Sequence, residues 1–584
     1  MSTRHWLTLN TPHRSSGGLA AAGLETSRPQ PRFASGRVAF ETPTITLHKA
    51  MANRGKMALV GMFFMLLRSV FLIGGALVTT PLIMKRLGRE SYGVWSLVQD
   101  VVGYGTLADL GLGTSTVMHL SRFEGERNAQ AYSNTLQSAK RHVRWQGFLV
   151  CLVLLGLVLV FPWVFEVQDV PTTVVRWTVL ICGLRVAVTL LGLTNTSVLK
   201  SAGRYDWLSF QETLVSVVML GVLILLAALG SGLVGLAVSQ FVVAALSQFS
   251  YFWMAARFQD RDLLVPPTVD PELESRLRNY GKSTIWSKVA GRVNAASGSV
   301  ILGFLQGPSS LAFYAPAVSL ITRVNAIMVL TLDFLGPVMA RALGQGDQAG
   351  FRRVFFLSSR FAACLSLLIA SSVVLYGREF LMAWLDDAEV VQKSYPLLAL
   401  LGLLLGVSIP SIPGNNLFLA LGNVELLKQR GISEAIVSSL LQFVLALWLG
   451  PLGVVLGTMV STFAIRGVMQ LSLVGTKLSE PAARIAKDVY LRPLLSLIPV
   501  LIAAGVLKTF VPLGQLRTLM MGWGVDVGEG GSRLSRLLTV GEIGLHGLVL
   551  AFVMGVGCLA ICLDSEARQM VLARWTALRK KLFR

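Results

Sequence analysis

The fold class follows from residues 59–81, which read LVGMFFMLLRSVFLIGGALVTTP. This stretch is long enough to cross the hydrocarbon core of a bilayer, since a helix of about 20 mostly apolar residues spans ~30 Å. Similar runs recur along almost the whole chain of 584 residues, of which 53% are hydrophobic and 14% charged. Soluble chains carry about 25% charged residues. The sequence therefore predicts an all-α polytopic membrane protein.

About fourteen such spans can be counted, and we expect them to form two pseudo-symmetric six-helix lobes plus two C-terminal helices. Their approximate limits are 59–81, 91–118, 145–165, 174–195, 208–229, 233–255, 283–305, 311–338, 354–376, 395–420, 430–449, 451–474, 493–511 and 541–563.

Composition divides the chain further. The predicted parts are a polar, disordered tail at 1–56, an N-lobe at 57–256, a cytoplasmic linker at 257–282, a C-lobe at 283–475, two additional helices with a Gly-rich outer loop (512–540) at 476–563, and a basic cytoplasmic tail at 564–584.

Basic residues indicate the orientation. The net charge of +21 would suggest nucleic acid in a soluble protein, but here Lys and Arg gather in short loops such as 122–144 and 257–282 and in the C-terminal tail. Cytoplasmic loops carry this excess, so both termini are predicted to lie inside, with membrane lipids rather than nucleic acid as partners.

The two lobes have related sequences. Leu87-Gly88 before Tyr92-Gly93 corresponds to Gln306-Gly307 before Leu311, and Gly203 corresponds to Gly422, with a spacing of 219 residues. Both halves begin inside, so they are predicted to be parallel repeats, and transporters built from repeats bind substrates at the repeat interface. The alternative is chance similarity between apolar helices.

Five cations lie within predicted spans and are the candidate substrate-binding residues: Arg68, Arg185, Lys288, Arg292 and Arg323. A cation at the bilayer centre costs at least ~2.5–3.5 kcal/mol unless it faces water or an anion. We therefore expect these side chains to line a wet chamber between the lobes, where a diphosphate head group would neutralise them. The alternative is that each pairs with an intramembrane acid for structural reasons.

Acids within the predicted spans can be interpreted in two ways, as binding sites for a coupling ion or as counter-ions of the cations. Asp100, Asp109, Asp333 and Glu434 are candidates for binding a coupling ion, and each of them, like Glu212, is equally a possible counter-ion for a cation. Asp109 lies in the segment Ala108-Asp109-Leu110-Gly111-Leu112-Gly113, where glycines permit close packing or local distortion.

No enzymatic site is predicted. The five cysteines (Cys151, Cys182, Cys364, Cys558 and Cys562) all lie in apolar spans and are interpreted as small buried hydrophobic residues. Cys558 and Cys562 share a helix face, but no His or carboxylate completes a metal site with them, so we expect no metal and no cofactor. The GxxxxGK[ST] phosphate loop is not found, so ATP hydrolysis by that route is not expected.

The motifs resemble those of one family. Pro81, Leu87 to Gly93, and Ala108 to Gly113 are similar to the opening of the O-antigen and polysaccharide flippases of the multidrug/oligosaccharidyl-lipid/polysaccharide exporter superfamily. Further resemblances lie at Ser299 to Gly303 with Tyr314, at Pro337 to Arg341 with Gly346-Asp347, and at Phe380 to Leu385. The resemblance covers about residues 59–475.

The resemblance implies a flippase of the bacterial inner membrane that works by alternating access on an undecaprenyl-diphosphate-linked oligosaccharide, together with a polysaccharide polymerase and other assembly proteins. Related members use ion gradients. The acid that the family often has in its seventh helix is missing from Asn294 to Gly298, so its role cannot be transferred.

Other functions fit the sequence less well. A drug or metabolite antiporter of the same superfamily should have acids and aromatic residues for cationic substrates, which the mid-span cations argue against. An integral-membrane glycosyltransferase or polymerase needs catalytic groups in sizeable outer loops, whereas the first outer loop has about ten residues with Glu90 as its sole acid. A structural scaffold would not explain the mid-span cations.

Overall fold

The computed structural model describes residues 64–562, apart from 65–66, 70, 73, 260, 269–270, 334 and 523–531, together with residue 568. The predicted tail at 1–56 lies outside the described residues, and so does the tail at 564–584 except for residue 568. Within the described part the elements are helical, which confirms the predicted all-α polytopic class. Twelve helices there are long and apolar enough to cross a membrane.

The N-terminal half contains a first helix at Leu67–Leu87 and a series of further helices. These are α2 (Arg89–Gly103), η1 (Tyr104–Asp109), α3 (Leu112–Gly125), α4 (Ala129–Val164), α5 (Thr172–Leu191), α6 (Leu193–Ser201), α7 (Tyr205–Ala228) and α8 (Gly232–Phe258), followed by η2 (Arg261–Leu263).

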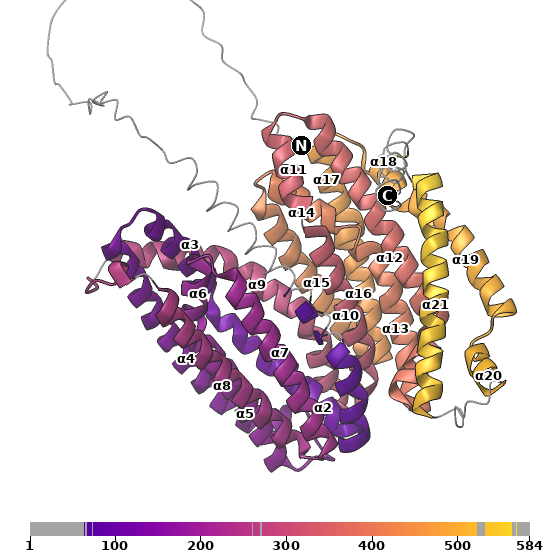
Figure 1. The fold of residues 1–584 in the computed structure, drawn as a ribbon, viewed down its shortest axis with the longest axis horizontal. Helices are drawn as coiled ribbons and strands as arrows, with labels where there is room; N and C mark the ends of the chain where they lie inside the picture. Colours follow the sequence, from indigo (N-terminus) through magenta and orange to yellow (C-terminus); the bar gives the residue numbers. More distant parts are fainter. Residues whose placement is uncertain are drawn as a thin grey trace, which may run out of the picture. The chain divides into compact units, whose positions relative to one another are not determined.

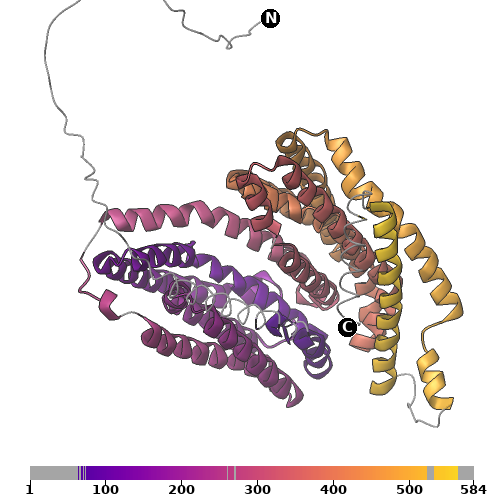
Figure 2. The same ribbon diagram turned by 45° about the horizontal axis from the view of Figure 1, so that its top comes forward.

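The C-terminal half repeats this series. Its elements are α9 (Pro271–Gln306), η3 (Pro308–Ser310), α10 (Leu311–Asp333), α11 (Leu335–Gly344), α12 (Gln348–Leu385), α13 (Ala388–Ser408), α14 (Ile412–Ala420), α15 (Val424–Leu449), α16 (Pro451–Thr462), η4 (Phe463–Met469) and α17 (Gln470–Leu478). In Figures 1 and 2, α2–α8 (indigo to magenta) and α10–α17 (rose to orange) form two bundles.

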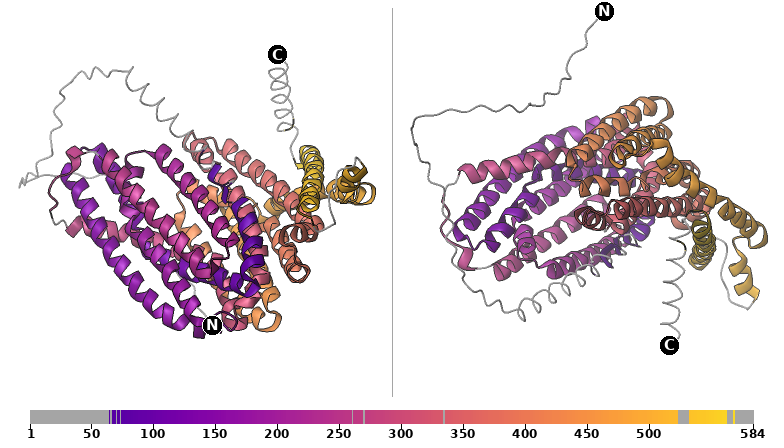
Figure 3. Two further views of the ribbon diagram at one scale, coloured as in Figure 1. Left: turned by 60° about the horizontal axis from the view of Figure 1, so that its bottom comes forward. Right: turned by 90° about the horizontal axis from the view of Figure 1, so that it is seen from above.

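The last helices pack on the second bundle. They are α18 (Ala482–Ala486), η5 (Lys487–Leu491), α19 (Arg492–Phe510), α20 (Gln515–Gly522), α21 (Arg533–Gly557) and η6 (Cys558–Cys562). Both α19 and α21 contact α12, and Figure 3 shows the yellow helices along one edge of the bundle. The segment 512–540, predicted as a Gly-rich loop, contains α20 and the first turns of α21.

Two of the fourteen predicted spans differ from simple transmembrane helices. The span at 91–118 is divided among α2, η1 and α3, because Leu110 and Gly111 adopt left-handed conformations with φ of 47° and 77°. The span at 283–305 lies within α9, which begins twelve residues earlier, at Pro271. Hydropathy locates the apolar part of a helix but not its ends. The division of the first span therefore follows from the glycine-containing segment at Gly111, and the longer α9 follows from the charged residues that precede its apolar part.

Backbone conformation repeats between the halves at the predicted spacing. The helices α4, α6, α7 and α8 begin 219 residues before α12, α14, α15 and α16. Positive φ angles recur at the same spacing, at Gly88 and Gly307 and again at Gly203 and Gly422. Turn geometry is set by local chemistry, so this recurrence supports a duplicated fold. The exact domain boundaries stay predictions.

The halves meet through close contacts of α2. A Cβ atom on Gly93 would lie only 2.0 Å from the carbonyl oxygen of Pro308, so the backbones of α2 and η3 touch where glycine alone fits. A Cβ on Gly303 of α9 would lie 2.7 Å from the side chain of Leu97. These glycines bring the polar side chains of α2 and α9 within reach of one another.

Candidate functional site

One face of α9 carries two of the predicted substrate-binding cations. Lys288 and Arg292 are one helical turn apart, so they share a face. Lys288 forms an ion pair with Asp109 of η1, and Nη2 of Arg292 lies 3.6 Å from Oδ1 of Asp100 on α2. Nη2 of Arg292 also donates to the carbonyl oxygen of Asp100, and the guanidinium lies 5.2 Å from the ring centroid of Tyr104. Two predicted cations and two predicted ion-coupling acids therefore form charge pairs across the junction of the halves.

The other face of α9 lines a cavity in the C-terminal half. Ser287, Asn294 and Gly298 border this space of about 600 Å³, together with residues of α10, α13, α15 and α16. Lys288 and Arg292 do not line it. The helix α9 thus separates the cavity from the ion pairs with the N-terminal half, a distinction that helical spacing alone did not reveal.

The three remaining predicted cations have different partners. Nη1 of Arg68 lies 2.6 Å from Oε2 of Glu212 on α7. Arg185 donates to the amide oxygen of Gln99 at 3.2 Å, and Arg323 donates to the carbonyl oxygen of Leu72 at 2.8 Å. Both acceptors are neutral. The alternative interpretation, in which a cation pairs with an acid, therefore holds for Arg68, Lys288 and Arg292. Among the described residues, no carboxylate partner is found for Arg185 or Arg323.

The last two candidate ion-coupling acids lie in contrasting surroundings. Asp333 is exposed at the end of α10. Glu434 on α15 is 4% exposed and accepts a hydrogen bond at 2.7 Å from Nε of Arg466 on η4, while its Oε2 atom has no donor among the described residues. Of the four predicted acids, Glu434 is the one that lines the cavity of the C-terminal half.

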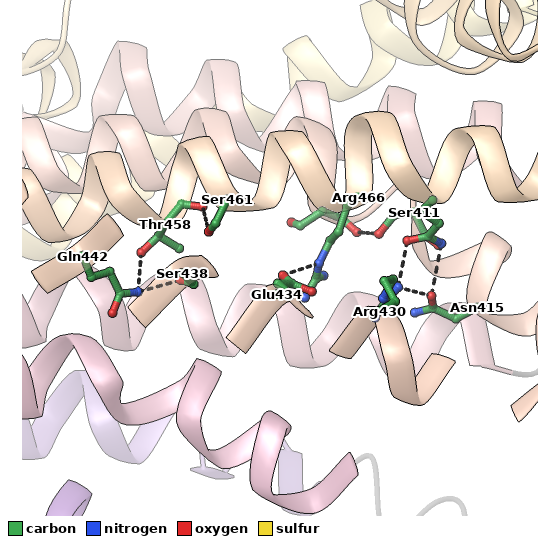
Figure 4. A network of polar contacts seen from close by, with 11 residues as sticks. Ser411, Asn415, Arg430, Glu434, Ser438, Gln442, Thr458, Ser461 and Arg466 are labelled. Atoms are coloured by element: carbon green, nitrogen blue, oxygen red, sulfur yellow. Dashed lines mark hydrogen bonds and ion pairs between the residues drawn. The ribbon is translucent and has the colours of Figure 1, made fainter. Parts of the chain in front are cut away.

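Several polar side chains that line this cavity take part in the contacts that Figure 4 shows. Arg430, one turn before Glu434, donates from Nη1 to the amide oxygens of Asn415 and Gln470. Gln470 in turn donates to the carbonyl oxygen of Ser411 at 2.8 Å. These hydrogen bonds hold a nearly buried guanidinium on neutral acceptors, and its Nε atom is left without an acceptor among the described residues.

Deeper in the cavity the network is neutral. The amide of Gln442 donates to the hydroxyl oxygens of Ser438 and Thr458, at 2.9 Å each, and its amide oxygen accepts from Ser297 of α9 at 2.8 Å. Hydroxyl and amide groups of this kind can bind sugar hydroxyls. The cavity thus combines a charged end, with two guanidinium groups and one carboxylate, and an uncharged polar end.

Sequence reasoning did not include Arg430 and Arg466 among the candidates. Arg466 lies inside the predicted span 451–474. The criterion that selected Arg323, a cation within a predicted span, therefore applies to Arg466 as well. Arg430 falls on a predicted span boundary, where a cation can reach the interface by snorkelling. Only the packing of α15 against α14 and α17 shows that Arg430 is buried.

The N-terminal half has an apolar groove instead. It has a volume of about 510 Å³ and is lined by α4, α5, the end of α2 and η1, chiefly by Val, Leu and Phe side chains such as Val153, Leu154 and Phe161. Tyr104 is the polar exception among the lining side chains.

Charged residues also connect the two halves outside these spaces. Arg89, at the start of α2, forms ion pairs with Asp387 and Glu389 at the start of α13, at 2.7 Å from Asp387. Lys85 lies 3.6 Å from Asp386. These partly exposed pairs cross the junction close to the contact between Gly93 and Pro308, and their disruption would let this side of the junction separate.

Comparisons with known proteins agree with this architecture. Residues 59–343 match the family described as polysaccharide biosynthesis protein. Among curated protein sequences, none matches the chain significantly.

Solved structures have a similar fold. An inward-facing multidrug resistance MATE family transporter of the MOP superfamily aligns with a TM-score of 0.59 at 14% identity, over 72% of this chain and 99% of that one. The lipid II flippase MurJ, in an inward closed conformation, gives 0.58 at 11% identity over 85% and 98%. A MOP superfamily transporter from Pyrococcus furiosus, described as having a binding pocket of reverse polarity, gives 0.52 at 15% identity over 73% and 97%.

Residues 59–343, just under half of the chain, thus match the family of polysaccharide biosynthesis proteins, and the multi-pass fold is similar to that of solved MOP superfamily transporters.

Proposed function

We propose that the protein is a flippase that moves a lipid-diphosphate-linked oligosaccharide, of the undecaprenyl diphosphate type, across the bacterial inner membrane by alternating access, with both termini in the cytoplasm. A polysaccharide polymerase and other assembly proteins would act on the product. The proposal extends the match of residues 59–343 to the polysaccharide biosynthesis family to a substrate class.

The observation that carries the proposal is a surplus of guanidinium groups, of which Arg430 is buried and Arg185 and Arg323 are half-buried. Arg185, Arg323 and Arg430 hydrogen-bond to neutral oxygens, and the Nε atom of each is buried without an acceptor among the described residues. A buried charge without a counter-ion is costly. A diphosphate supplies several charged oxygens that accept from guanidinium donors, so binding of such a head group would offset this cost.

The same surplus argues against the alternative functions. A cation-coupled drug antiporter would place acids where cationic substrates bind, whereas the cavity of the C-terminal half has two guanidinium groups for one carboxylate. A glycosyltransferase or polymerase would need catalytic carboxylates in outer loops. MurJ, a structural neighbour, is a flippase of lipid II by its description, which suits the proposed class.

Glu434 is the candidate for ion coupling within this proposal. Its free Oε2 atom lies beside the cationic end of the cavity. A proton or Na⁺ on this carboxylate would weaken its attraction for Arg466 and leave that guanidinium to the head group. Asp100 and Asp109 are held by Arg292 and Lys288, so we rank them below Glu434.

The test is a flipping assay in liposomes with a fluorescent lipid-diphosphate oligosaccharide. The triple variant Arg185→Ala/Arg323→Ala/Arg430→Ala should flip it at least tenfold more slowly than the wild type, and the three Arg→Lys changes should be less harmful because they retain the charge. Arg122→Ala is the matched control, since Arg122 is exposed and paired with Glu126. Wild-type flipping by a well-folded triple Ala variant would refute the proposal.

A further inference from the structure

Three of the five cysteines converge where the C-terminal helices pack on the second bundle. Cys364 lies on α12, and Cys558 and Cys562 lie on η6 at the end of α21. Their sulfur atoms all lie within 4.8 Å of one another, with 3.5 Å between Sγ of Cys364 and Sγ of Cys562. The sequence placed Cys558 and Cys562 on one helix face, but Cys364 is about 200 residues away and joins them only through folding.

We propose that Cys364, Cys558 and Cys562 form a three-thiolate site for a soft, thiophilic metal ion, with Cu(I) as the representative. Thiolate ligands select soft ions of this kind. A three-coordinate site requires three sulfur atoms a few ångströms apart around one centre, and the side chains already meet this condition. Structural zinc sites have four ligands, whereas the group of mutually close ligand atoms among the described His, Cys, Asp and Glu side chains here has three.

A cationic side chain lies beside the cluster. Arg360, one turn before Cys364 on α12, is buried and donates from Nη1 to the carbonyl oxygen of Cys562 at 3.0 Å. Arg360 and Arg492 share one acid, Asp488, whose Oδ1 atom lies 3.5 Å and 3.1 Å from them. The positive charge of a nearby guanidinium group stabilises the thiolate form that a bound metal ion requires.

The backbone also marks this position. The helix α21 changes from α to π geometry at Cys558–Cys562. Single π turns are rare and occur frequently at functional sites. Here the π turn carries both cysteines of η6 at its two ends. Cys562 and Cys364 are buried, whereas Cys558 is partly exposed and offers a way in for an ion.

Binding would fasten α21 to α12. Each thiol must lose its proton to bind Cu(I), so binding releases protons and is stronger at higher pH. Because the cluster is distant in sequence from the network of Figure 4 and contains none of its residues, the metal site does not depend on the proposed flippase activity.

The test uses the full-length protein in detergent, reduced and without oxygen, titrated with Cu(I) against a coloured Cu(I) chelator. The wild type should compete for one Cu(I) per chain, and X-ray absorption of the copper should show three sulfur neighbours. Cys364→Ser and Cys562→Ser should each abolish the tight binding of one Cu(I) ion. Cys151→Ser and Cys182→Ser, which lie outside the cluster, should retain it. Thermal unfolding should shift upward with Cu(I) only in the wild type and these two controls.

Other outcomes would overturn the site. If the wild type binds no stoichiometric Cu(I), or if all four variants bind equally, the cluster is a packing feature. If Cu(I) is not bound but air links Cys364 to Cys562, as mass spectrometry of a proteolytic digest would show, the cluster forms a disulfide instead. A variant that does not fold is replaced by Cys→Ala at the same position, which preserves an apolar environment.

Discussion

The two halves of the protein share a fold, but the groove of one half and the cavity of the other differ in chemistry. The groove of the N-terminal half is lined almost entirely by apolar side chains, whereas the cavity of the C-terminal half contains Arg430, Glu434 and Arg466. At the spacing of 219 residues, these three positions correspond to Gln211, Val215 and Ser247. Gln211 and Val215 lie on α7 and Ser247 lies on α8, and neither helix lines the groove, so the groove and the cavity occupy different places in their halves.

This contrast suits an amphiphilic substrate. We expect the apolar groove to hold the hydrocarbon chain of a lipid and the polar cavity to hold its head group, because each surface lowers the free energy of the part with matching polarity. The two spaces are separated by the α2–α9 junction, whose ion pairs Asp109–Lys288 and Asp100–Arg292 tie the halves together.

The largest expected effect comes from breaking the buried ion pair of the C-terminal half. Arg466→Ala leaves the carboxylate of Glu434 buried without its partner, which should lower the free energy of unfolding by about 3–5 kcal/mol. Chemical unfolding in detergent measures this loss. Ser247→Ala, at the corresponding position of the other half, should change stability by less than about 1 kcal/mol. Equal effects of both changes would contradict the asymmetry of the halves.

The next effect concerns head-group binding. Arg430→Ala removes a buried guanidinium, and hydrogen bonds to charged groups contribute about 1.5–3 kcal/mol, so affinity should fall about tenfold to a hundredfold. Calorimetric titration with a short-chain prenyl-diphosphate sugar measures it. The matched control is Gln211→Ala, which should bind as the wild type does. If instead Gln211→Ala weakens binding and Arg430→Ala does not, the head group binds in the N-terminal half.

A smaller effect should follow from narrowing the apolar groove. A Cβ on Gly183 would lie 2.1 Å from Cδ1 of Leu154, so Gly183→Leu crowds the groove at a cost of about 1 kcal/mol or more. We expect flipping of a long-chain lipid to slow by about fivefold relative to a short-chain analogue. Gly156→Leu on α4 is the control, because no atom lies within 4 Å of its Cβ position. An unchanged ratio of the two rates would place the hydrocarbon chain elsewhere.

The smallest effect should come from the ion pairs that link the halves at their partly exposed edge. Arg89→Ala removes the pairs with Asp387 and Glu389, and exposed pairs contribute about 0.2–1 kcal/mol each. The population with this side open should rise a few-fold, as distances between spin labels on the exposed residues Ser231 and Gln392 of the same side would report. High salt should mimic the change in the wild type by screening. No response to either treatment would mean that the glycine contacts alone hold this side closed.

Much of the fold could be predicted because it depends on local patterns. Apolar runs of about 20 residues gave the helical membrane class, and the glycines at 88, 203, 307 and 422 gave the repeat, since each has a positive φ that other residues rarely adopt. The break between η1 and α3 was foreseen only as a possible distortion at Gly111. The start of α9 at Pro271 was missed because polar residues open that helix.

The candidate site was less predictable, because charge pairing depends on distant helices. Sequence spacing placed Lys288 and Arg292 on one face of α9, but it could not tell that this face meets Asp109 and Asp100 and that the opposite face lines the cavity. Their role in substrate binding, like that of Arg68, Arg185 and Arg323, stays a prediction.

The sequence by itself determined that the chain crosses a membrane many times, that its two halves are repeats, and that cations lie where hydrocarbon is expected, because hydropathy and turn chemistry act over short distances along the chain. Only the tertiary structure decided which cations are neutralised and which are left over, and only it joined Cys364 to Cys558 and Cys562. The physical reason is that the energy of a buried charge or thiol depends on the atoms within a few ångströms, and those atoms come from helices that are far apart in sequence.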